Sequence, residues 1–110
     1  MPLVTVLNLR ATDDLTAIDE TIVRALASMP ELAINDWEID VIPLLRPDGS
    51  DRDVTRINVD LWEHPDRSKT ALQELATRVA EAFRSVAGAE RHIKVVIRPD
   101  DVGAAGWVSL

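Results

Sequence analysis

The 110-residue chain is about the size of one domain, and its 46% hydrophobic and 28% charged residues are close to the averages of soluble globular proteins. Its formal net charge of -7 disfavours nucleic acids and anionic membranes as partners, and the absence of cysteine excludes disulfides and thiolate chemistry. The two histidines have no recognisable metal-ligand spacing, so neither a metal nor another cofactor is expected.

The first half of the chain predicts a strand, a helix and a second strand. Residues 3–9 are rich in β-branched and aliphatic residues and predict a short strand. This stretch is too short for a membrane span and lacks the basic flank of a signal peptide, so a cytoplasmic location is expected. Apolar residues three or four apart predict an amphipathic helix over 13–29, with Thr12 or Asp13 as its N-cap. Loose alternation over 37–45 predicts the second strand.

The second half repeats this order after a turn at residues 46–51, whose proline, aspartate and glycine favour a tight turn. Alternation over 57–62 predicts a third strand. A helix is expected from about residue 67 to 87, ended by Gly88, and a final strand over 91–98.

Two consecutive β-α-β units, over about residues 2–46 and 54–110, predict a single α/β (α+β) domain covering 1–110. The four strands would form one sheet with both helices on one face, and we expect the bare face to meet another subunit. Two arrangements fit. In a ferredoxin-like sheet a strand of the other unit separates the two strands of each unit, whereas in the alternative each unit keeps its strands parallel and adjacent. Periodicity does not distinguish them.

Short motifs along the whole chain resemble those of the tautomerase superfamily, in the group of oxalocrotonate tautomerase, malonate semialdehyde decarboxylase and macrophage migration inhibitory factor. The segments that carry the resemblance are, in order, MP, LRATDD, INDWEIDVIP, WEHPDRS and DDVGAAGW. The resemblance implies adjacent parallel strands within each unit, a homotrimer around a central channel and a catalytic N-terminal proline. His64 replaces the first turn arginine of the decarboxylases, Arg67 is offset by one position, and the chain has no tyrosine.

Pro2 is the first candidate for catalysis. Removal of Met1 would leave Pro2 with a secondary amine, and an α-amino group has a pKa of about 8 that burial lowers. A neutral amine can take a proton from a carbon next to a carbonyl and return it elsewhere, which is tautomerisation. A charged amine would instead act as an acid in a decarboxylase or hydratase. The remaining alternative is a non-catalytic oligomeric binding protein in which Pro2 is incidental.

Arginines are the candidates for binding a small-molecule carboxylate substrate, because a guanidinium matches two carboxylate oxygens. Arg10 and Arg67 are the first choices. Arg46, Arg52 and Arg56 would join them if the central turn folds over the site, and are otherwise solvated charges.

The remaining candidates would move protons or exclude water. The resemblance to the decarboxylases implies that Asp36 orients a water or carries a proton, although it is also a favoured turn residue. His64 can act as an acid near neutral pH or serve only its turn. Trp107, and with it Trp62, would line an apolar pocket.

Overall fold

The computed structural model describes residues 2–47, 53–106 and 108–110. It contains two β-α-β units and two short 3-10 turns. In chain order they are β1 (Leu3–Leu9), α1 (Leu15–Leu26), η1 (Pro30–Leu32), η2 (Asp36–Glu38), β2 (Asp40–Leu45), β3 (Val54–Trp62), α2 (Lys69–Ala87) and β4 (His92–Asp100). The predicted turn at residues 46–51 lies largely outside the described residues.

The sheet has the strand order β2-β1-β3-β4, in which β1 and β2 are parallel, β3 and β4 are parallel, and β1 and β3 are antiparallel. Each unit therefore keeps its two strands adjacent. This order confirms the predicted α/β fold and excludes the ferredoxin-like alternative, in which a strand of the other unit would lie between them.

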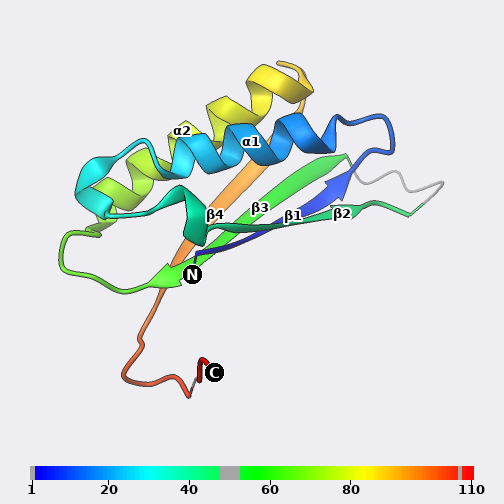
Figure 1. Cartoon of the computed structure of the whole chain (residues 1–110). Helices are drawn as coiled ribbons and strands as arrows, with labels where there is room; N and C mark the ends of the chain where they lie inside the picture. The colour runs from blue at the N-terminus through cyan, green and yellow to red at the C-terminus, as the bar shows by residue number, and fades with distance from the viewer. Residues whose placement is uncertain (1, 48–52, 107) are drawn as a thin grey trace.

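Both helices lie side by side on one face of the sheet, and the other face is bare in the single chain (Figure 1). Alternate residues of the strands point toward the helices and form the core with the inner helix faces. The fully buried core residues include Val4, Val6, Ile57, Val59 and Leu61 from the sheet and Ile18, Ile22, Leu26, Leu75, Val79 and Phe83 from the helices. Ile42, Leu44 and Val96, which we call the open-face patch, lie on the bare side and are exposed.

Several element ends differ from the sequence predictions. The second strand begins at Asp40 instead of residue 37, because residues 36–38 form η2. The N-cap of α1 is Asp14, whose side chain accepts the Ala17 N–H at 3.1 Å, because the Asp13 carboxylate is bound to Arg91. None of the described helices is long and apolar enough to cross a membrane.

Candidate active site

Pro2 lies at one end of the sheet, directly before β1. The next residue, Leu3, pairs with Asp40 at the start of β2 and with Asp60 near the end of β3. Pro2 is buried, and its carbonyl accepts the Asp40 N–H at 3.2 Å. Figure 1 shows the N-terminus beside the point where β3 ends. The fold therefore holds Pro2 where the connections into β2 and out of β3 converge.

Asp36 begins η2, in the connection that leads into β2 at this same end. Its carboxylate is exposed and lines a surface hollow together with Val23, Ala27 and Ser28 at the end of α1. The short turn is closed by the Ile39 N–H, which donates to the Asp36 carbonyl at 3.3 Å. The turn role that the sequence allowed for Asp36 is thus present, and its carboxylate remains accessible.

His64 follows β3 and is exposed in the connection to α2. Its Nδ1 accepts the Asp66 N–H at 3.2 Å and lies 3.6 Å from the Asp66 carboxylate. The imidazole also lines a hollow with Asp101 and Val102, which follow β4. Like Asp36, His64 stabilises a turn at the Pro2 end of the sheet and keeps its ring accessible.

Arg67 connects two segments at this end through backbone carbonyls. Its Nε and Nη2 donate to the Leu32 carbonyl at 3.1 and 3.0 Å, and its Nη1 donates to the Trp62 carbonyl at 2.7 Å. Burial lowers the pKa of Arg67, an effect that the Glu38 carboxylate partly opposes. These contacts with described residues use three of the five guanidinium N–H donors. Arg67 therefore ties η1 to the end of β3, a role that nothing in the local sequence indicated.

Arg10 lies at the opposite end of the sheet, just beyond β1. Arg10 is eight positions along the chain from Pro2, which at the rise of a β-strand is about 25 Å. Its Nη2 contacts Asp53 Oδ1 at 2.6 Å, and Arg46 Nη1 lies 3.6 Å from the same oxygen. Within one chain Pro2 and Arg10 cannot share a substrate, so the structure does not bring these two predicted site residues together.

Of the other predicted residues, Arg56 is exposed on the bare side of β3. Trp62 is partly buried at the end of β3, which is the end of the sheet where Pro2 lies. Trp107 and Arg52 lie outside the described residues.

A buried ion pair near Arg10 was not predicted from the sequence. Arg91, whose side chain is 1% exposed, donates to both carboxylate oxygens of Asp13 at 2.7 and 3.2 Å and to the Thr55 hydroxyl at 2.8 Å. Asp13 also accepts the Arg10 N–H at 2.7 Å. Burial acts to raise the pKa of Asp13, but the hydrogen bonds from Arg91 and Arg10 outweigh it, so that pKa lies below its ordinary value. The two residues are 78 positions apart, and no local pattern could reveal their contact.

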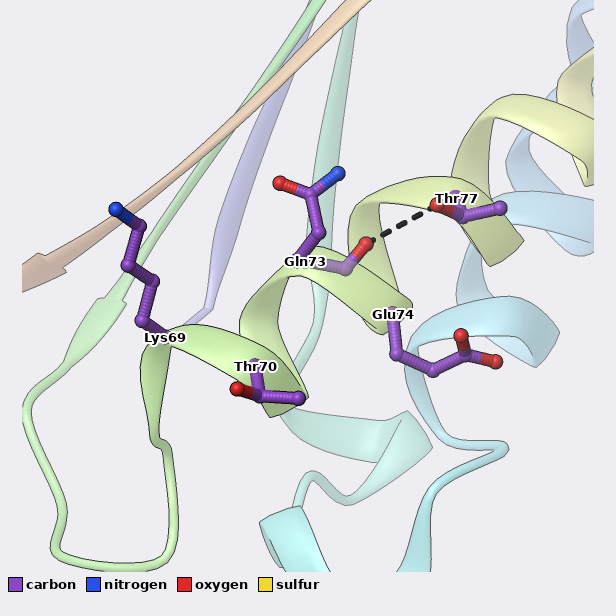
Figure 2. Close-up of a pocket in the computed structure, with 5 residues that line it drawn as sticks. All are labelled: Lys69, Thr70, Gln73, Glu74 and Thr77. Atoms are coloured by element: carbon purple, nitrogen blue, oxygen red, sulfur yellow. Dashed lines mark hydrogen bonds between the residues drawn. The ribbon is translucent and has the colours of Figure 1, made fainter.

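The hollow in Figure 2 lies along the outer side of α2. All of its lining residues come from this one helix, and they are Lys69, Thr70, Gln73, Glu74 and Thr77. Thr77 Oγ1 donates to the Gln73 carbonyl at 3.1 Å, as a threonine inside a helix commonly does. The hollow therefore brings together no residues from separate elements and is a surface feature of the helix.

The sequence matches no protein-family model and no curated protein. The fold, in contrast, matches several solved structures. One is a malonate semialdehyde decarboxylase inhibited by 3-bromopropiolate, with a TM-score of 0.73 and 17% identity over 98% of this chain and 90% of the other. A fused 4-OT that forms an asymmetric trimer has a TM-score of 0.78 and 14% identity over 96% and 92%. A protein inactivated by 2-oxo-3-pentynoate has a TM-score of 0.73 and 15% identity over 96% and 92%.

These similarities extend over nearly the full length of each pair, and the matched structures include tautomerase-superfamily enzymes. At such low identity a structural match demonstrates the fold and leaves the chemistry of the site open. The chain therefore has the fold of the tautomerase superfamily.

Proposed function

We propose that the chain is a tautomerase-type isomerase that uses the amine of Pro2, after removal of Met1, on a small 2-oxo or unsaturated carboxylic acid. The observation that carries this proposal is the position of Pro2, buried at the sheet end where the β2 and β3 connections meet, in a chain with this fold. Of the matched proteins, one is inhibited by 3-bromopropiolate and another is inactivated by 2-oxo-3-pentynoate. They support the substrate class, since both compounds are small unsaturated acids.

The proposed reaction moves one proton. Burial disfavours the charged form of the Pro2 amine, and a neutral amine takes a proton from the carbon next to the substrate carbonyl. The same amine, now charged, returns that proton to another carbon of the resulting enolate. Asp36 and His64 would assist the proton transfer, and Trp107 would exclude water.

The substrate carboxylate would be bound by arginines from more than one chain. Arg67 belongs to the Pro2 end, and its contacts with described residues leave two guanidinium N–H donors for a ligand. Arg10 lies about 25 Å from Pro2 of its own chain, so it would act at the site of a neighbouring copy. The exposed open-face patch and the trimeric 4-OT structure of the same fold support a homotrimer.

Decarboxylation of a small oxo acid at the same site is the second candidate function. It is favoured by the match to a malonate semialdehyde decarboxylase over 98% of this chain. This chemistry requires a charged Pro2 amine as the acid. An amine pKa of about 6 would indicate the isomerase and one of about 9 the decarboxylase, which an NMR titration of nitrogen-labelled Pro2 would measure.

The test begins with the mass of the purified chain, which must show that Met1 is removed. Pro2→Ala is then compared with the parent on the enol of a substituted pyruvate, and we expect a loss of about a hundredfold or more in kcat/KM. Pro47→Ala is the matched control, because Pro47 is exposed at the far end of β2. Retained Met1, or equal rates for Pro2→Ala and the parent, would reject the proposal and favour a non-catalytic binding protein.

A further inference from the structure

Two arginines at the end of the sheet opposite Pro2 hold a carboxylate of the chain itself. Asp53 Oδ1 lies 2.6 Å from Arg10 Nη2 and 3.6 Å from Arg46 Nη1. The Arg10 and Arg46 side chains are 32% and 28% exposed, whereas that of Asp53 is 67% exposed. The arginines thus form the more enclosed part of this contact, and the carboxylate is the part that solvent reaches.

The backbone fixes both arginines in place. The Arg10 N–H donates to Asp13 at 2.7 Å, and Asp13 is itself held by the buried Arg91. The Arg46 N–H donates to the Leu9 carbonyl at 2.9 Å, which extends the pairing of β1 with β2. Adjacent strands therefore present the two guanidinium groups toward the same point. Asp53, in contrast, comes before β3 begins and lies outside the strand pairing.

We propose that Arg10 and Arg46 form a binding site for the carboxylate of a small acid, and that Asp53 occupies this site when the acid is absent. A free carboxylate offers the same oxygens as the Asp53 side chain, and its binding would exchange one charge-assisted contact for another. Asp53 then acts as a competitor built into the chain. The ligand class rests on the proposed function, but the binding itself requires no chemistry at Pro2.

The Asp60–Arg98 pair of the sheet provides a matched comparison. The carboxylate of Asp60 accepts from Nε and Nη2 of Arg98 at 3.1 and 3.3 Å. This pair contains a single arginine, and neither partner contacts Arg10 or Arg46. Replacing Asp60 by asparagine removes the same charge from the chain as replacing Asp53, so the comparison isolates the effect of removing the carboxylate that contacts Arg10 and Arg46.

The test is an equilibrium titration of the full chain with malonate at low ionic strength, followed by calorimetry and by the NMR signals of the arginine Nε–H groups. Solvent screens this exposed contact, so its loss should have a modest effect, and Asp53→Asn should bind malonate up to about fivefold tighter than the parent. Asp60→Asn should bind it as the parent does. Adding Arg10→Gln to Asp53→Asn should abolish the gain.

Equal malonate affinities for Asp53→Asn and the parent would overturn the proposal, as would an equal gain in Asp60→Asn. Should Asp53→Asn fail to fold by circular dichroism, Asp53→Ser provides the same comparison. Because binding is measured without turnover, the difference in malonate affinity does not depend on whether Pro2 is catalytic. A negative titration likewise leaves the proposed role of Pro2 intact.

Discussion

At the scale of single residues, the Asp13–Arg91 pair places two opposite charges almost out of contact with solvent, with side chains only 8% and 1% exposed. A buried charge is tolerated only when it has a partner and hydrogen bonds, and here Thr55 and the Arg10 N–H add to the ion pair. Among the described residues, only Arg91 Nε remains as a buried side-chain donor without a partner. The Arg91 guanidinium also lies 5.4 Å from the centre of the Phe83 ring, where a cation is attracted to the aromatic face. Removing either charge leaves the other buried without its counterion.

Asp13→Asn should therefore destabilise the chain at pH 7 by about 3 kcal/mol or more. The pKa of Asp13 is lower in the folded chain than in the unfolded one, where it is about 3.9. Its contribution is then complete above that value and is lost as the pH falls through the folded pKa. Urea unfolding should show that the difference in unfolding free energy between Asp13→Asn and the parent is smaller at pH 3 than at pH 7.

Asp19→Asn is the control for this measurement, because Asp19 is exposed on α1. Asp19→Asn should have the same unfolding free energy as the parent at both pH values. If the difference in unfolding free energy between Asp13→Asn and the parent stayed constant with pH, the assigned role of the carboxylate would be contradicted.

Individual residues were predictable where their signal is local. Pro2 and Arg10 could be selected from the sequence because they stand at the two ends of one strong strand pattern, and the structure places them there. Their use as site residues remains a prediction. The contacts of Arg67 and Arg91 could not be predicted, because their partners Leu32 and Asp13 are 35 and 78 positions away.

At the scale of elements, β1 contains an irregularity before its last residue. The pairing register with β2 shifts between Val6 and Leu9, and Asn8 within this interval has a φ of 66°. That left-handed conformation suits asparagine better than most residues, and the Asn8 side chain also donates to the Val54 carbonyl at 3.1 Å. The bulge thus joins the end of β1 to the start of β3 and sets the direction in which Arg10 leaves the strand.

Two substitutions separate the conformational effect from the hydrogen bond. Asn8→Ala loses both the hydrogen bond and a residue suited to positive φ, and should cost about 2 kcal/mol of unfolding free energy. Asn8→Gly keeps the conformation and loses only the hydrogen bond, so its cost should be about half as large. Urea unfolding of both variants would test this order, which an equal or smaller loss for Asn8→Ala would refute.

Element types followed from periodicity, and element ends often did not. The first strand was predicted with the bounds that the structure has, because its apolar run is short and flanked by polar residues. The last strand continues through Pro99 to Asp100, beyond its predicted end at residue 98. Proline lacks the N–H that an inner strand needs, but β4 is an edge strand and tolerates it.

At the scale of the whole molecule, the bare face of the sheet requires explanation. The helix-facing side of the strands is packed, while Ile42, Leu44 and Val96 on the other side are exposed to solvent in the single chain. Apolar residues gathered on one sheet face are typical of a surface that another subunit covers. The homotrimer of the proposed function would bury this open-face patch.

Sedimentation velocity should accordingly show the parent as an assembly of three chains of 12.2 kDa each. Ile42→Lys places a charge in the open-face patch and should shift the population to monomer, because burying an unpaired ammonium is costly. Val86→Lys is the matched control, since Val86 on α2 is 38% exposed and Ile42 43% exposed. A dimeric parent, a trimer that survives Ile42→Lys, or equal dissociation by Val86→Lys would contradict the proposed assembly.

The overall architecture was predictable to the level of its two units, because each β-α-β pattern is local. Which strand of one unit lies beside which strand of the other depends on long-range packing, and here only the resemblance to known proteins favoured the observed order. The placement of Arg10 far from Pro2 follows from the length of β1, since the two residues flank this strand at its opposite ends.

The Asp13–Arg91 pair also bears on how the chain folds. Its aspartate lies just before α1 in the first β-α-β unit, and its arginine lies just before β4 in the second. The ion pair at the start of α1 therefore forms only when the segment that leads into β4 is in place. The β1 and β3 strands similarly join the two units across the middle of the sheet. Despite their similar patterns, the two halves are therefore expected to unfold together as one cooperative unit.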